Sequence, residues 1–430
     1  MLVGTQIRKV AIVGGSRIPF ARAHGAYARL GNQQMLTAAL QGVVERFGLE
    51  RALLGEVAAG AVMKHSRDFN LVRESVLGTT LDPRTPGVDL QRACGTSLEA
   101  AILIANKIAL GQIDSGIAAG VDTVSDTPIV YPRSYQQLLL RAYRARSALG
   151  RLQPFLGLRP KHFVPQFPSA NEPRTRLSMG QSCELMAQRW QITRAAQDAL
   201  AFESHKRAAS AWERGFFDDL VVPCNGLERD DNVRADVSLA KLGSLRTSFE
   251  RSDRGTLTAG NSTPLTDGAS AVLLASESWA RARGLPILAW LRFGKAAAVD
   301  FTNAEEGLLM APAYAVPAML RDAELELGDF DFYEIHEAFA AQVLCTLAAW
   351  ESPQFCRERL GLEAPLGAIE RAKLNVVGSS VAIGHPFAAT GARIVATLAK
   401  LLAEHPKSKR GLVSVCTAGG MGVTAILERA

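Results

Sequence analysis

The stretch Val88-Asp89-Leu90-Gln91-Arg92-Ala93-Cys94-Gly95-Thr96-Ser97-Leu98-Glu99-Ala100 joins a short apolar run to an alanine-rich segment through a glycine-flanked cysteine. We interpret it as a strand, a tight turn and a buried helix, with Cys94 at the N-terminus of the helix. Free backbone N–H groups and the positive end of the helix dipole favour a thiolate there. Cys94 is therefore a candidate sulfur nucleophile. The alternative is a small buried hydrophobic residue, as most isolated cysteines are.

The composition indicates a globular protein with two or three domains. The chain has 430 residues, of which 48% are hydrophobic and 21% charged. Its six cysteines form no Cys-x-x-Cys pair, so we expect neither a disulfide framework nor a zinc site, and we expect a reducing compartment. The net charge of +6 favours an anionic partner only weakly, because 48 basic residues face 42 acidic ones. Ile7–Gly15 predicts a first strand and turn rather than a signal peptide, and the glycine-rich run Gly411–Leu427 predicts no membrane span.

Strand-like runs alternate with helical ones over most of the chain, which predicts a layered α/β fold. An internal repeat is visible when Cys94 is taken as the reference point. In both copies a strand, a turn with a reactive residue, an apolar helix and a second strand follow one another. The predicted strands are 10–13, 56–62, 88–91, 115–120, 374–377 and 411–415, and the predicted helices are 34–47, 97–110 and 392–402.

The repeat has a consequence for the reactive residues. Its second copy carries Gly384-His385-Pro386 at the turn and Cys416 at the end of the last strand. Two copies packed about a pseudo-twofold axis would bring Cys94, His385 and Cys416 together. The alternative is that any α/β protein repeats strand and helix without such a meeting.

A different kind of segment, roughly 127–246, separates the two copies. Residues 132–176 hold nine Arg or Lys residues and one acid, Glu172, together with many apolar side chains. This composition predicts contact with an anionic membrane surface, a partner protein or an anionic ligand. The alternative is a solvated helical lid with a basic outer face. A second helix is predicted at 183–214, and nucleic acid is not expected, because no recognition motif accompanies the charge.

Two further motifs carry polar chemistry: His336-Glu337-Ala338-Phe339 after a predicted strand, and a glycine-rich turn after Cys416. Each alone has a structural explanation, since a lone histidine is usually satisfied structurally and a glycine-rich turn is usually only a turn. A metal site built from Cys94, Cys416, His336 and His385 is conceivable. None of the four has a ligand partner at the close spacing common in zinc sites, so we predict no metal.

Together these motifs resemble the thiolase family, and the resemblance spans the whole chain. It rests on the stretch around Cys94, on 384–386, on Cys416, and on 178–180 and 255–269, which look like the family's lid pattern and signature. It implies a duplicated fold of two similar βαβ halves in an α-β-α-β-α sandwich, with an inserted helical loop domain. The implied boundaries are 1–126 and 247–284 for the N-terminal half, 127–246 for the loop domain and 285–430 for the C-terminal half.

The resemblance also implies a division of labour. Cys94 takes the acyl group as a thioester, His385 accepts its proton and then helps to hold the thioester oxygen of the substrate, and Cys416 is the second acid/base. Backbone N–H groups of Cys94 and Ala418 would form an oxyanion hole. Coenzyme A and its acyl esters are substrates, and no cofactor is bound permanently. The implied coenzyme A contacts are Met179, Arg234, Thr263, Ala338 and Phe339.

Three positions depart from the family pattern. His336 stands where many thiolases have an asparagine that holds a water in an oxyanion hole; it can also donate a hydrogen bond, but its protonation would add a pH dependence. Ala418 replaces a common glycine and keeps the backbone N–H. Ser178 stands where many relatives have histidine.

The departures at His336 and Ala418, together with the long basic and apolar insertion, resemble the thiolase subunit of fatty-acid oxidation trifunctional complexes. This branch implies 3-ketoacyl-CoA thiolysis in a cytoplasmic homodimer or dimer of dimers, with a hydratase/dehydrogenase partner subunit and peripheral contact with the inner membrane face. The alternatives are a biosynthetic acetoacetyl-CoA thiolase and a non-catalytic lipid-carrier or scaffold subunit. A β-ketoacyl synthase would lack Cys416. Chain-length preference and physiological direction stay open.

Overall fold

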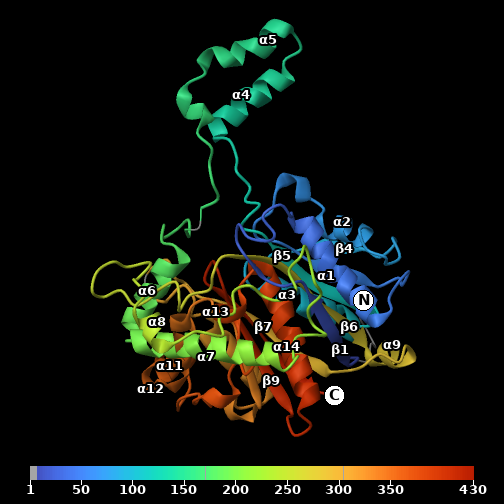
Figure 1. Cartoon of the computed structure of the whole chain (residues 1–430), viewed down its shortest axis with the longest axis vertical. Coiled ribbons are helices and arrows are strands. Elements are labelled where there is room, and N and C mark those ends of the chain that lie inside the picture. The colour runs from blue at the N-terminus through green and yellow to red at the C-terminus, as the bar shows by residue number, and fades with distance from the viewer. Residues whose placement is uncertain (1–6, 170, 304) are drawn as a thin grey trace.

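The computed structural model describes residues 7–169, 171–303 and 305–430; residues 1–6 of the predicted N-terminal half and residue 170 of the basic segment lie outside it. Figure 1 shows a layered body from which one pair of helices projects.

The strands are β1 (Val10–Arg17), β2 (Ala21–Arg22), β3 (Glu56–Ala59), β4 (Gly87–Asp89), β5 (Ser115–Asp122), β6 (Thr266–Ser276), β7 (Ala289–Ala298), β8 (Phe332–Ile335), β9 (Arg410–Thr417) and β10 (Met421–Arg429). The α-helices are α1 (Asn32–Phe47), α2 (Leu71–Leu77), α3 (Thr96–Ala109), α4 (Arg133–Arg144), α5 (Ala148–Leu152), α6 (Met179–Arg189), α7 (Arg194–Glu213), α8 (Leu239–Gly243), α9 (Glu277–Ala282), α10 (Ala311–Ala323), α11 (Ala340–Glu351), α12 (Pro353–Leu360), α13 (Ser380–Ile383) and α14 (Thr390–Glu404). Short 3₁₀ turns are η1 (Ser66–Asp68), η2 (Gln153–Gly157), η3 (Pro160–Phe163), η4 (Leu327–Asp329), η5 (Arg371–Lys373) and η6 (Phe387–Ala389).

The strand order β4-β3-β5-β6-β1-β7-β10-β9-β8 is nearly symmetric about its centre. From the centre outward, β1 corresponds to β7, β6 to β10, β5 to β9 and β3 to β8. The inner strands of each half are antiparallel, whereas β3 with β5 and β8 with β9 are parallel. The halves join through the pairs Ala11–Trp290 and Ile12–Ala289. The predicted duplicated α/β fold is confirmed.

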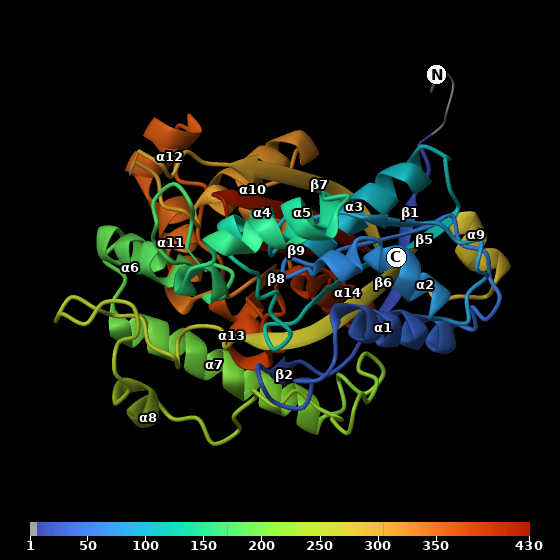
Figure 2. The ribbon, with the colours of Figure 1, turned by 90° about the horizontal axis from the view of Figure 1, so that it is seen from above.

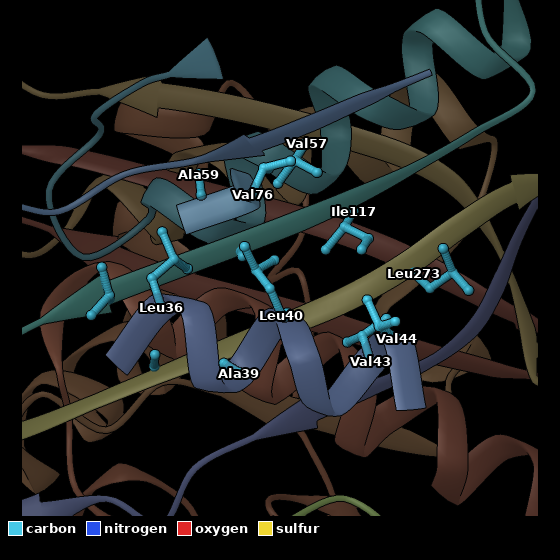
Figure 3. Packing of buried hydrophobic residues seen from close by; sticks show 14 of the residues in the cluster. Leu36, Ala39, Leu40, Val43, Val44, Val57, Ala59, Val76, Ile117 and Leu273 are labelled. Atoms are coloured by element: carbon cyan, nitrogen blue, oxygen red, sulfur yellow. The ribbon is translucent and has the colours of Figure 1, made fainter. Parts of the chain in front are cut away.

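Helices form three layers around the two half-sheets. The apolar side chains of α1 recur at helical spacing and pack with α2 against the outer face of the N-terminal half-sheet, where Leu36, Leu40 and Val43 face Ile117 and Leu273 (Figure 3). Helices α3 and α14 lie between the halves, and α10 and α11 cover the C-terminal half-sheet. Figure 2 shows α14 near the centre of the molecule, with α1 and α10 toward opposite sides. The five predicted layers are present.

The two central helices approach each other through a glycine. A Cβ atom at Gly391 of α14 would lie 2.3 Å from the backbone nitrogen of Leu98 in α3. The Ala392 N–H donates to Ser97 Oγ at 2.9 Å across the same contact. The close approach places the starts of the two helices together.

We expect Gly391→Ala to destabilise the protein. Alanine gains about 1 kcal/mol over glycine in a helix, but overpacking costs typically ~1–3 kcal/mol and more against backbone, so the net free energy of unfolding should fall. The matched control is Gly243→Ala in α8, where a Cβ meets no atom within 4 Å among the described residues. Urea unfolding followed by circular dichroism measures the unfolding midpoint and the free energy of unfolding of both variants. Equal midpoints would contradict the packing argument.

Three predictions of secondary structure are wrong. The single helix at 183–214 is two helices, α6 and α7, because Gln191 adopts a φ of +53° and Thr193 Oγ1 accepts the Ala196 N–H as an N-terminal cap. The strand at 374–377 is a single bridge between Leu374 and Tyr333, because Asn375 adopts a φ of +48° and turns the chain.

The predicted turn at 14–15 is also absent. Gly14 and Gly15 continue β1, and the irregularity there is a shift in the pairing register with β6 between Ile12 and Gly14. A Cβ at Gly15 would lie 2.6 Å from that of Ala396 in α14. The glycine therefore permits close packing of sheet and helix rather than a turn.

Residues 127–169 form a projecting excursion, which stands away from the body in Figure 1. Its stem closes where Val130 and Gln166 exchange backbone hydrogen bonds of 3.0 and 2.8 Å. Beyond the stem, α4, α5, η2 and η3 pack on one another. Many of their apolar side chains face solvent: Leu139, Leu140, Tyr143, Leu149, Leu152, Leu156, Phe163 and Val164. None of the helices in the described ranges is both long and apolar enough to cross a bilayer.

Candidate active site

Cys94 lies on a tight turn between β4 and α3. Ala93 adopts a φ of +43°, a left-handed conformation that is uncommon for residues with a side chain. The Thr96 hydroxyl holds the turn, since it donates to the Ala93 carbonyl at 2.7 Å and accepts from the Arg92 N–H at 2.9 Å. The sulfur therefore sits just before the first turn of α3, as the sequence predicted.

Cys94 is half-buried as a residue, and its sulfur lies close to the backbone N–H groups of Cys94 itself and of Ala418. These donors favour the thiolate, but burial outweighs them, and with the nearby carboxylate of Asp122 it raises the pKa of Cys94 to about 12. The helix N-terminus favours a thiolate, as the sequence indicated, but it does not outweigh desolvation. Cys94 is a neutral thiol, so its use as a nucleophile requires a base.

His385 is held in the loop that leads into α14. Its backbone N–H donates to Thr266 Oγ1 at 2.7 Å, and its Nδ1 lies 2.6 Å from Thr390 Oγ1. Burial, reinforced by the charge of Arg393, lowers the pKa of His385 to about 3. The imidazole is neutral at rest, so one of its ring nitrogens can accept a proton.

His336 stacks against His385, with ring centroids 4.0 Å apart and an interplanar angle of 45°. It follows β8, where its backbone N–H donates to the Ser414 carbonyl of β9 at 2.8 Å. Its Nδ1 lies 2.7 Å from Ser380 Oγ, and its Nε2 is buried with no hydrogen-bond partner among the described residues. Burial, His385 and Arg393 hold the pKa of His336 well below its usual range, so the ring is neutral at rest and the pH dependence expected from its protonation moves to lower pH.

Cys416 ends β9 beside the Cys94 turn. A Cβ at Gly95 would lie 3.0 Å from Thr417 Cγ2, so the turn and the strand touch. Cys416 is 2% exposed, and burial together with the nearby Cys94 sulfur raises its pKa well above the usual range. Both thiols are therefore protonated at rest. Cys94 and Cys416 lie close together, and the loop that carries His385 reaches the same region, because Asp122 is close to Cys94 and accepts the Ala388 N–H at 2.7 Å.

The predicted coenzyme A contacts divide into two groups. Met179, Ala338 and Phe339 share one apolar cluster with Cys416, and Thr263 donates through its N–H and hydroxyl to the Ala338 carbonyl at 3.1 and 3.2 Å. Arg234 lies apart, beside α7, where its backbone N–H donates to His205 Nδ1 at 3.2 Å. Ser178, the departure from the family pattern, caps α6 by accepting the Gln181 N–H.

Several polar residues of the site were missed in the sequence. Asp122 accepts the N–H groups of Val62, Met63 and Ala388 and so ties β5 to the loop after His385. Arg393 and Glu334 are charged residues 2% and 0% exposed. The sequence feature that could have revealed these two residues is a charged side chain inside an otherwise apolar predicted helix or strand. No group of three or more metal-ligating side chains occurs in the described ranges.

Comparison with known proteins agrees with this geometry. The sequence matches the family models "Thiolase, N-terminal domain" over residues 10–278 and "Thiolase, C-terminal domain" over 286–429. A 3-ketoacyl-CoA thiolase of Pectobacterium carotovorum subsp. carotovorum is 40% identical over 427 residues, 98% of this chain and 96% of that protein. A 3-ketoacyl-CoA thiolase of Yersinia pestis is 39% identical over 434 residues, 99% and 98% of the two chains.

Solved structures give the same answer for the fold. The acetyl-CoA acetyltransferase of Bacillus anthracis superposes with a TM-score of 0.81 at 28% identity, over 99% of this chain and 100% of that chain. Human mitochondrial 3-ketoacyl-CoA thiolase in complex with CoA superposes with a TM-score of 0.81 at 23% identity, over 99% of both chains, which bears on the fold alone. With both halves matched and near-complete coverage, the chain belongs to the thiolase family.

Proposed function

We propose that the protein is a 3-ketoacyl-CoA thiolase, which cleaves 3-ketoacyl-CoA with coenzyme A to acetyl-CoA and an acyl-CoA shortened by two carbons. The observation that carries the proposal is that two protonated thiols, Cys94 and Cys416, lie close together, and that the loop carrying one ring of a neutral imidazole pair is tied to Asp122 near Cys94. Thiolysis needs one sulfur to hold the acyl group and a second acid/base for the other substrate. The names of the relatives that match nearly the full chain support this assignment.

In the first half-reaction, His385 accepts the Cys94 proton and the sulfur attacks the C3 carbonyl of the substrate. The negative charge on that oxygen is met by the N–H groups of Cys94 and Ala418, which already lie at the sulfur. The C2–C3 bond then breaks and its electron pair goes to the acetyl-CoA fragment. Cys416 donates its proton to C2, acetyl-CoA leaves, and the acyl group stays on Cys94.

In the second half-reaction, the Cys416 thiolate takes the proton of the incoming coenzyme A thiol. The coenzyme A sulfur attacks the thioester on Cys94, and acyl-CoA leaves. The Cys94 sulfur recovers its proton from His385, which closes the cycle with all protons returned. The two acids start neutral because both are buried, so no charge has to be stored in the resting site.

The same steps in reverse condense two acetyl-CoA molecules, and the structural match to an acetyl-CoA acetyltransferase favours this second candidate. The deciding experiment is thiolysis of 3-ketoacyl-CoA substrates from C4 to C16, measured by loss of the 3-ketoacyl absorbance. We expect activity beyond C4. Activity confined to C4 would assign the protein to acetoacetyl-CoA, and absence of activity at every length would favour the non-catalytic scaffold.

We further propose that Met179, Thr263, Ala338 and Phe339 line the pantetheine path and that Arg234 contacts the adenine end. Two observations support the pantetheine path. Met179, Ala338 and Phe339 share one apolar cluster with Cys416. Thr263 is joined to this cluster because its hydroxyl donates to the Ala338 carbonyl. We also propose the division into two halves and a loop domain at 127–246. The junction of the two family models between residues 278 and 286 supports the boundary between the halves.

We also propose a cytoplasmic homodimer or dimer of dimers that joins a hydratase/dehydrogenase subunit and touches an anionic membrane surface through 132–176. Its support is the excursion, where basic residues and exposed apolar side chains share two short helices. Light scattering during size-exclusion chromatography measures the oligomer, and a monomer would contradict the proposal.

The membrane contact predicts co-sedimentation with vesicles that contain phosphatidylglycerol. Replacing Leu149 and Leu156, 79% and 87% exposed, by serine should lower the affinity for the vesicles at least tenfold. A tenfold loss corresponds to about 1.4 kcal/mol, which is less than the burial of two CH₂ groups at ~0.8 kcal/mol apiece. The matched control replaces Leu53 and Leu239 of the body, 51% and 52% exposed. Equal pelleting of the two variants would sink the membrane contact.

A further inference from the structure

A buried cation lies directly behind the paired imidazoles. Arg393 of α14 is 2% exposed, and its Nη2 donates to Ser380 Oγ at 2.9 Å and to Ser379 Oγ at 3.3 Å. The carboxyl groups of Glu334 and Glu337, 0% and 2% exposed, lie close enough to influence its charge, but burial raises the pKa of both, and no ion pair joins them to Arg393 among the described residues. A buried charge lowers stability unless it is paired and fully hydrogen-bonded. The cation therefore calls for a role beyond stability.

The hydrogen bonds from Arg393 through Ser380 to His336 can be arranged in only one direction. A guanidinium has donors and no acceptor, so the Ser380 oxygen accepts from Arg393. The hydroxyl has one proton, and its other hydrogen-bond partner within the described residues is His336 Nδ1 at 2.7 Å. If His336 Nδ1 donated to Ser380 instead, the hydroxyl proton of Ser380 would have no acceptor among the described residues. Ser380 thus donates to Nδ1, and the neutral imidazole of His336 carries its proton on Nε2.

The second imidazole has the opposite arrangement. Thr390 Oγ1 lies 2.6 Å from His385 Nδ1 and donates to the Pro386 carbonyl at 3.3 Å. Because the hydroxyl has one proton, the oxygen accepts from Nδ1–H of His385. His385 then has a bare Nε2, which suits a base for the Cys94 proton. The two stacked rings differ in which nitrogen is protonated, so one is a donor and the other an acceptor.

We propose that Arg393 is a positioning residue that acts through Ser380 to keep His336 in the tautomer with its proton on Nε2, so that this nitrogen donates a hydrogen bond to the thioester oxygen of acetyl-CoA. The buried and unpartnered His336 Nε2 is the donor. The proposal rests on the proposed thiolase function, because the oxygen becomes an enolate when the C2–C3 bond breaks. A fixed donor stabilises that charge without reorganisation.

The test compares Ser380→Ala with Ser379→Ala. Both remove a hydroxyl that accepts from Arg393, but Ser380 alone of the two contacts His336. We expect Ser380→Ala to lower kcat/KM for thiolysis about 10- to 100-fold, as for loss of one charge-assisted hydrogen bond, Ser379→Ala to stay within about threefold, and Ser380→Thr to retain activity. Arg393→Met should resemble Ser380→Ala if it folds.

A second readout needs no turnover. In protein labelled with ¹⁵N-histidine, the wild-type His336 resonances should show a protonated Nε2 and an unprotonated Nδ1, and Ser380→Ala should shift this balance. A protonated Nδ1 in the wild type, or equal activity loss in the two serine variants, would overturn the proposal. A wild type that has the expected tautomer but no thiolysis would instead contradict the proposed function. Alkylation of Cys94 should stay unchanged in Ser380→Ala, which separates a positioning effect from general damage to the site.

Discussion

Replacing Cys94 by alanine should lower the rate of thiolysis by roughly 10⁴- to 10⁶-fold, the range seen when a hydrolase loses its nucleophile. The variant keeps the Ala418 N–H, Cys416 and both imidazoles but has no sulfur on which the acyl group can rest. Cys416 cannot replace it, because it lies 2% exposed in the apolar cluster and serves as the second acid/base. Mass spectrometry after mixing with 3-ketoacyl-CoA should show an acyl adduct in the wild type and none in Cys94→Ala.

The control is Cys224→Ala. Cys224 is also half-buried, and burial raises the pKa of its thiol too, but it packs against the outer core beside α1. Its removal should leave thiolysis within a few-fold of the wild type. Thiolysis in Cys94→Ala within tenfold of the wild type would exclude Cys94 as the nucleophile.

Replacing His385 by alanine should slow acylation of Cys94 about 10²- to 10⁴-fold at pH 7, the range for loss of a general base. The reason is the pKa of about 12 that burial confers on the thiol. Without the imidazole, attack depends on the small fraction of thiolate. Below its pKa that fraction rises tenfold for each pH unit, so the log of the variant's rate should climb with a slope near one between pH 6 and 9. The wild type should show a flatter profile, because the pKa of its base, about 3, lies below this range.

Single-turnover acylation with 3-ketoacyl-CoA measures this step without coenzyme A, whose own thiol would add a titration. The control is His24→Asn, an exposed histidine with a φ of +62° that asparagine tolerates. A pH profile of His385→Ala that parallels the wild type would show that another group takes the Cys94 proton.

Much of the fold follows from local pattern. The alternation of apolar strands and helices predicted the α/β class, and the repeat around Cys94 and His385 predicted the duplication that the symmetric strand order confirms. Predictions from short-range sequence patterns were wrong where an unusual backbone conformation ended a strand or a helix. Asn375 and Gln191 adopt positive φ values, which ended a predicted strand and broke a predicted helix.

The sequence alone determined which chemical groups the protein carries and in which order, because strand and helix periodicity and the motifs around Cys94, His385 and Cys416 are local properties. The tertiary structure decided their ionisation and their proton positions. Burial keeps Cys94 a neutral thiol although the helix N-terminus favours a thiolate, and it keeps His336 neutral. The hydrogen-bond path from Arg393 through Ser380 to His336 joins residues from three segments of the chain. Desolvation and hydrogen-bond direction depend on atoms that only the packed fold brings within a few ångströms, so no local pattern could reveal them.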